Sequence, residues 1–233
     1  TCLAPADKER RKKKKAGAPV AKTLEVNRTR DEIRLAFVAV DHDWRIYTDG
    51  GADGNGAGGD WGEAGFGVAV YKVDKDPTIG YDPATGLGAG MIRKASLYGP
   101  VVTDAASPFY MGAERGTNQT GELCGVGQAL LWLRSQSSEE PVAIGVDSLY
   151  AANQAEEWWT ANRNKKLIST VAGLLTEVRR KRAVTFVHVK GHSGETGNDQ
   201  ADEQVQWGKT DGPYSRMKLG GGGEGDGRHG PLR

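Results

Sequence analysis

Four acidic residues occupy positions that a need for solubility does not explain. Asp49 interrupts the apolar run RIYTD, and Asp147 ends the apolar run VAIGVD. Glu122 lies at the start of one helical pattern, and Asp202 lies in the last one. Each alone has an ordinary explanation, because Asp is favoured in turns and helix caps and Glu near helix N-termini. Taken together, the four residues lead us to the hypothesis of a common cleft.

Carboxylates that gather in one cleft repel each other and stay protonated unless a cation neutralises them. A hard divalent cation does this, since carboxylate oxygens are the natural ligands of Mg²⁺ and Mn²⁺. Two such ions about 4 Å apart can hold the attacking and leaving oxygens of a phosphodiester displacement. The sequence has no cluster of His and Cys that is typical of zinc sites. The four carboxylates therefore predict two Mg²⁺ ions, with Mn²⁺ as a substitute.

The elements that must position these residues follow from the spacing of apolar side chains. An alternating pattern on both sides of a Gly-rich turn predicts a hairpin over residues 43–73. Further strands are expected at 108–115, 141–148 and 183–189, and helices at 120–136, 149–159, 166–182 and 198–207. Three strands followed by alternating helices and strands predict a mixed α/β sheet with helices packed on it. Residues 74–107 are rich in Gly and Pro and predict an irregular insertion, with SLYGPVV as a short strand inside it.

The composition is that of an ordinary soluble globular protein. The chain has 233 residues, of which 37% are hydrophobic and 26% are charged. We therefore expect one domain with tails, and no apolar run is long enough to span a membrane. The two cysteines, Cys2 and Cys124, form no disulfide or zinc pattern, which favours an intracellular, reducing compartment.

The net charge of +1 conceals an asymmetry along the chain. Residues 1–34 contain eleven Lys and Arg against five Asp and Glu, so this arm carries +6 and the remainder −5. The block RRKKKK within it is typical of a solvated tail, of a nuclear address, or of a nucleic-acid contact. We expect a basic, disordered arm over residues 1–42, a folded domain over 43–210, and a flexible Gly-rich tail over 211–233.

Four stretches carry a resemblance to a known family. YTDGGADGNG, TNQTGEL, VDSLYA and HVKGHSGETGNDQAD resemble, in order, the four motif blocks of the ribonuclease H family, type 1 branch. The resemblance covers residues 45–207. It implies a ribonuclease H-like mixed five-stranded sheet with helices on both faces. It also implies an endonuclease that hydrolyses the RNA strand of RNA/DNA hybrids with two metal ions.

The resemblance assigns roles to individual residues. The metal-binding catalytic carboxylates would be Asp49, Glu122, Asp147 and Asp202. His192 would assist turnover, through product release or proton transfer, from a Gly-flanked loop that lets it swing over the site. A solvent-exposed loop histidine is the simpler explanation in the absence of the other blocks.

The resemblance also implies contacts to the two strands of a hybrid. The residues that would read RNA 2′-hydroxyls in the minor groove are Asn55, Asn118 and Gln119, whose amides both donate and accept hydrogen bonds. Trp158 would lie against the DNA strand. The alternatives are that the asparagines serve turns and that Trp158 or Trp159 belongs to the core.

The chain departs from the family pattern at the insertion, at the arm, and in a short segment before the last strand. That segment lacks the basic protrusion of many cellular members and leaves only Arg163, Lys165 and Lys166 nearby. One alternative is the ribonuclease H domain of a retroelement polyprotein. Two others are a catalytically silent nucleic-acid-binding module, which the four carboxylates argue against, and a transposase or integrase core, which does not show the stretch KGHSGETGNDQAD. The expected partner is an RNA/DNA hybrid, without a membrane, for a monomer or a part of a larger polyprotein.

Overall fold

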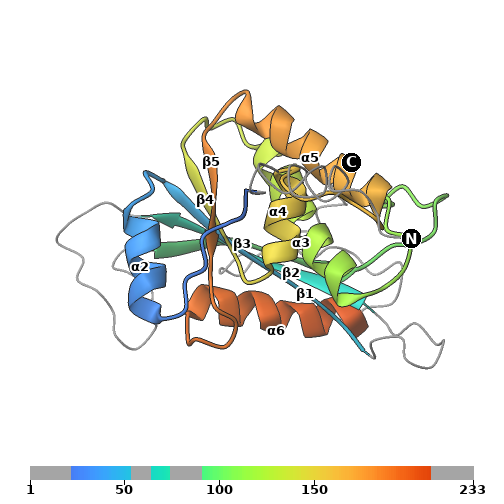
Figure 1. Ribbon diagram of the computed structural model, residues 1–233, viewed down its shortest axis with the longest axis horizontal. Coiled ribbons are helices and arrows are strands. Elements are labelled where there is room, and N and C mark those ends of the chain that lie inside the picture. The colour runs from blue at the N-terminus through green and yellow to red at the C-terminus, as the bar shows by residue number, and fades with distance from the viewer. Residues whose placement is uncertain (1–21, 54–63, 74–90, 211–233) are drawn as a thin grey trace, which may run out of the picture.

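The computed structural model describes residues 22–53, 64–73 and 91–210, which form a five-stranded sheet between helices (Figure 1). The strands are β1 (Trp44–Ala52), β2 (Ala64–Val73), β3 (Met91–Pro100), β4 (Val142–Val146) and β5 (Val184–His188). They lie in the order β3-β2-β1-β4-β5. The first three pair in antiparallel fashion, whereas β1, β4 and β5 are parallel. The predicted mixed sheet is confirmed.

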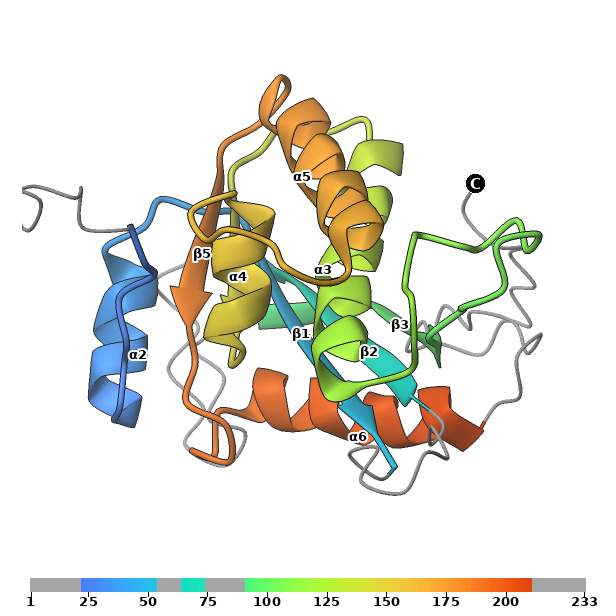
Figure 2. The same ribbon diagram turned by 45° about the vertical axis from the view of Figure 1, so that its right-hand side comes forward.

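Helices cover both faces of this sheet (Figure 2). One face carries α3 (Asn118–Ser135), α4 (Leu149–Ala155) and α5 (Lys165–Arg179), and the other carries α2 (Arg30–Val38) and α6 (Thr196–Thr210). All five residues of β4 are buried, as expected of a parallel strand that is covered on both sides. Among the described residues, no helix is long and apolar enough to cross a bilayer.

The expectation of a disordered arm that extends to residue 42 is wrong for residues 22–42. Thr29 and Glu32 form a reciprocal capping box that starts α2. Ile33 and Phe37 lie one turn apart and are 0% and 1% exposed, because they pack against the sheet face that contains Tyr47. Residues 1–21, with the basic block, and the tail 211–233 lie outside the described residues.

The third strand also differs from the expectation. The structure has no strand at 108–115, where turns such as the Tyr110 N to Ser107 O hydrogen bond (3.1 Å) occur. The strand instead is β3, which is longer than the short SLYGPVV strand expected within the insertion. It is an edge strand whose residues 92–94 are exposed, so its sequence lacks the alternation of a half-buried strand. The remainder of the insertion, residues 74–90, lies outside the described residues.

Candidate active site

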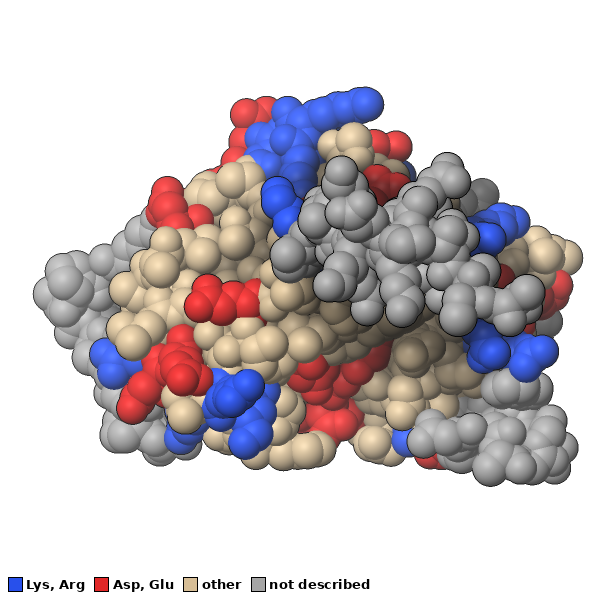
Figure 3. Space-filling view, viewed as in Figure 1, with Lys and Arg blue, Asp and Glu red and all other residues tan. Residues whose placement is uncertain are grey.

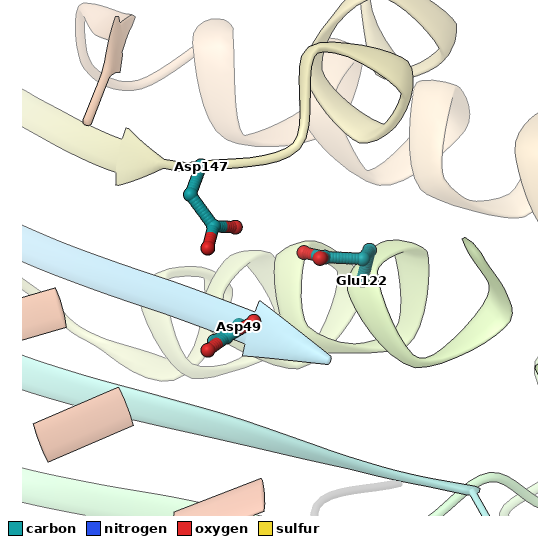
Figure 4. Close-up of side chains that lie close together, drawn as sticks. All are labelled: Asp49, Glu122 and Asp147. Carbon is teal, nitrogen blue, oxygen red and sulfur yellow. The ribbon is translucent and has the colours of Figure 1, made fainter. Parts of the chain in front are cut away.

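Three carboxylates from three different elements meet at the carboxyl ends of the central strands (Figure 4). Asp49 lies on β1, Asp147 follows β4, and Glu122 projects from α3. One oxygen atom of each residue lies within 4.8 Å of the oxygens of the other two. The structure therefore brings together three of the four carboxylates that the sequence singled out, closely enough for one cation to contact all three.

The pairing of parallel strands places two of these carboxylates at one edge. Thr48 of β1 lies opposite Val146 of β4 in the parallel register. The next residues, Asp49 and Asp147, therefore lie side by side at the carboxyl ends of these two central strands. This is why an acidic residue at the end of each apolar run was informative in the sequence.

Glycine at two positions allows helices to approach the strands at this edge. A Cβ atom on Gly50 would lie 1.9 Å from the backbone N of Glu122, so a side chain there would displace α3. A Cβ atom on Gly67 of β2 would lie 2.0 Å from the carbonyl O of Ala201 in α6. The absence of side chains at these positions brings Glu122, and Asp202 beside Ala201, toward Asp49.

Burial and mutual repulsion disfavour the charged forms of these carboxylates. Burial, with the charges of Asp147 and Asp202 adding to it, raises the pKa of Asp49 to about 8. The hydrogen bond from Gly50 N to Asp49 Oδ1 (2.6 Å) opposes this increase. Burial is also the main cause that raises the pKa of Glu122 and of Asp147. Without a cation, the cluster therefore holds protons at a pH where carboxylic acids ordinarily have none.

Unpartnered oxygens show that the cluster suits a hard cation. Glu122 Oε2 and Asp147 Oδ1 are buried and accept no hydrogen bond from the described part of the protein. Buried carboxylate oxygens without donors are costly, and a divalent cation supplies the missing interaction. Figure 3 shows Asp and Glu side chains gathered in a hollow above α6, with space open to the solvent on this face.

Asp202 and His192 lie beside the three carboxylates. Asp202, on α6, raises the pKa of Asp49 through its charge and a hydrogen bond, yet it does not belong to the set of three. His192 is exposed, has a φ of 54°, and favours the ionised form of Asp147 electrostatically. A metal-binding role for Asp202 and a catalytic role for His192 stay predictions.

Of the predicted substrate-binding residues, Asn118, Gln119 and Trp158 lie outside the buried core. Asn118 and Gln119 are exposed in the first turn of α3, and Asn118 Oδ1 accepts a hydrogen bond from Ala52 N (2.7 Å). Trp158 is half-buried after the end of α4, with Lys22 Nζ 5.8 Å from its ring centroid. Asn55 lies outside the described residues.

Asn198 is a site residue to which sequence reasoning gave no role. It is only 3% exposed, and a hydrogen bond from its side chain lowers the pKa of Asp147. Its Oδ1 atom has no partner among the described residues. Asn198 precedes Asp202 by four residues in α6, so both project from one side of the helix. The four-residue spacing from Asp202 could have identified Asn198 as a site residue. It was not used, because Asn is common in turns for backbone reasons alone.

Comparisons with known proteins identify the family of the chain. The family model described as RNase H matches residues 41–209. Ribonuclease H of Hyphomonas neptunium is 26% identical over 166 residues, which cover 67% of this chain and 85% of the relative. Ribonuclease H of Chlorobium phaeobacteroides is 29% identical over 169 residues, covering 67% and 88%.

Two solved structures share the fold at low sequence identity. One is LC9-RNase H1, a type 1 RNase H, with a TM-score of 0.52 and 18% identity, covering 77% of this chain and 76% of that protein. The other is the PFV RNase H domain, with a TM-score of 0.51 and 18% identity, covering 74% and 97%.

Proposed function

The chain belongs to the ribonuclease H family, and from this membership we propose that it hydrolyses the RNA strand of RNA/DNA hybrids. The observation that carries the proposal is the convergence of the Asp49, Glu122 and Asp147 carboxylates (Figure 4). Without the carboxylate cluster, the structure would support an assignment of the fold but not of a catalytic activity.

We propose that Asp49, Glu122 and Asp147, with Asp202 beside them, hold Mg²⁺. The support is an all-oxygen donor set, two unpartnered oxygens, and pKa values raised by burial. The bound cation would supply Lewis-acid chemistry, by which it activates water and neutralises charge that develops on a phosphodiester. The ionised carboxylates would fix the position of the cation at this edge.

His192 and Asn198 both act next to Asp147 in this proposal. His192 is exposed at the rim, where its ring can give a proton to a leaving oxygen or take one from it. Asn198 is buried and holds the Asp147 side chain through its hydrogen bond. Asp147 is thereby kept in the orientation that the cluster requires.

Hybrid recognition is proposed for three residues outside the buried core. The exposed amides of Asn118 and Gln119 suit contacts with RNA 2′-hydroxyls. The half-buried ring of Trp158, next to the cation of Lys22, suits the opposite strand. A silent binding module is disfavoured, because phosphate binding alone gains nothing from buried carboxylates that repel phosphates.

Cleavage of a hybrid by matched carboxylate variants tests the proposal. Asp49→Asn removes a charge from the cluster at nearly constant volume, so hybrid cleavage in Mg²⁺ should fall by orders of magnitude. Asp104→Asn removes an exposed carboxylate from the loop after β3 and should cleave like the wild type. Equal rates for Asp49→Asn and the wild type would refute the proposed role of the cluster.

A further inference from the structure

A buried tyrosine and a buried glutamate form a hydrogen bond close to the site. Tyr47 on β1 is 0% exposed and Glu195 is 8% exposed. Tyr47 Oη donates to Glu195 Oε1 at 2.5 Å. A buried carboxylate without a hydrogen-bond donor carries a large desolvation cost. The Tyr47 hydroxyl offsets this cost and so favours the buried position of the Glu195 side chain.

Glu195 terminates the loop that carries His192. At the other end of this loop, Val189 N donates to Val146 O at 2.8 Å, next to Asp147. Residues 190–194 therefore bridge two fixed points, with His192 at their centre. The loop residues His192 and Gly194 have φ values of 54° and 76°, so the bridge takes a specific bent path.

Tyr47 connects this loop to the strand of the catalytic cluster. It precedes Asp49 by two residues on β1, so the two side chains project from the same face of the sheet. Its ring also packs against the start of α6, since a Cβ atom on Gly197 would lie 2.1 Å from Tyr47 Cε2. The carbonyl O of Glu195 accepts hydrogen bonds from Asn198 N (2.9 Å) and Asp199 N (3.0 Å).

We propose that Tyr47 and Glu195 are positioning residues that hold the His192 loop over the acidic cluster, an inference that rests on the proposed function. Without the tyrosine hydroxyl, the Glu195 carboxylate would turn toward water and draw the adjoining loop with it. The body of α6 would remain in place, because Gln204 Oε1, near the middle of the helix, still accepts from Val68 N (3.0 Å) in the sheet. The position of His192 is therefore expected to change, whereas that of Asp202 on α6 is not.

Tyr47→Phe tests this inference, and Tyr71→Phe is its matched control. Tyr71 is 1% exposed, its ring lies 6.0 Å from that of Tyr47, and its hydroxyl donates to Gln200 in α6 and not to the loop. We expect Tyr47→Phe to lower kcat for hybrid cleavage about tenfold at an unchanged KM, the loss expected for one hydrogen bond to a charged group. Tyr71→Phe should keep both constants.

A cycle with His192→Ala separates positioning from a general loss of structure. In the His192→Ala background, Tyr47→Phe should lower kcat by less than about twofold, because the group through which it acts is gone. Glu195→Gln, whose amide oxygen accepts the same hydrogen bond, should recover most of the activity that Glu195→Ala loses. If the losses from Tyr47→Phe and His192→Ala multiply instead, the pair does not act through His192.

Histidine NMR of ¹³C-labelled protein provides a readout that does not require cleavage. The His192 signal, assigned by its absence from His192→Ala, should shift in Tyr47→Phe and Glu195→Ala but not in Tyr71→Phe. An unshifted signal in Tyr47→Phe would overturn the inference. If the His192 signal shifts but the wild-type protein cleaves no hybrid, the positioning role of Tyr47 and Glu195 is supported and the proposed function is refuted.

Discussion

Asp49→Asn is expected to stabilise the metal-free protein while it abolishes cleavage. The pKa of Asp49 is raised from 3.8 to about 8, so the folded state binds this proton more tightly than the unfolded state does. Stability is therefore lost as the pH rises from about 4 to 8. Each pH unit in this window costs about 1.4 kcal/mol, which amounts to roughly 4 kcal/mol at pH 7.

Asparagine removes this cost because it carries no charge at any pH. After allowance for its own burial, we expect a gain of about 2 to 4 kcal/mol in the free energy of unfolding at pH 8. For a domain of this size, that gain corresponds to an increase in Tm of roughly 4 to 16 °C. At pH 4 the difference between the two proteins should nearly vanish, since Asp49 in the folded state is then protonated and uncharged.

Thermal unfolding in EDTA at pH 4 and pH 8 measures both differences. Mg²⁺ should then raise the Tm of the wild type by binding to the folded state, and should raise that of Asp49→Asn much less. An Asp49→Asn variant that melts at or below the wild-type Tm at pH 8 in EDTA would refute the electrostatic account of the cluster.

Three further predictions concern the cation, the arm and the N-terminal helix. Mg²⁺ and Mn²⁺ should each support hybrid cleavage, whereas Ca²⁺, with ligand distances of about 2.3 to 2.6 Å, should permit hybrid binding without cleavage and compete with Mg²⁺; activity restored only by Zn²⁺ would contradict this. Deletion of residues 1–21 should weaken hybrid binding and flatten its salt dependence, by about 0.9 in the log–log slope for each phosphate that the arm neutralises, with little change in kcat; an unchanged slope would exclude the arm from binding. Phe37→Ala should lower the free energy of unfolding by about 3 to 5 kcal/mol, as measured by urea denaturation, because it empties a buried site under α2; a loss below about 1 kcal/mol would show that α2 is not part of the folded unit.

The central sheet and the acidic cluster were predictable from the sequence for a common reason. Strand β4 is short, wholly buried and ends directly before Asp147, so its apolar run marks both the strand and the carboxylate. Strand β1 gives the same signal before Asp49. Because β1 and β4 are parallel neighbours, their carboxyl ends lie side by side. The two carboxylates could therefore be placed together without knowledge of any other contact between distant residues.

Helix α2 was missed, and strand β3 was predicted too short, because composition outweighed pattern. The charge of residues 1–34 favoured a disordered arm, although Thr29 and Glu32 have capping-box spacing and Ile33 and Phe37 form an apolar pair one turn apart. Strand β3 pairs at the edge of the sheet, where only its second half is buried. The hydrogen bond between Tyr47 and Glu195 joins residues 148 positions apart, so no local sequence pattern predicts it.

The most direct test of the proposed function is the cleavage of matched RNA/DNA, RNA/RNA and DNA/DNA duplexes of one sequence, with each strand labelled in turn, in Mg²⁺ and in EDTA. The proposal predicts products from the RNA strand of the RNA/DNA hybrid alone, in Mg²⁺ alone. Comparable cleavage of either homoduplex, cleavage in EDTA, or an intact hybrid would contradict it.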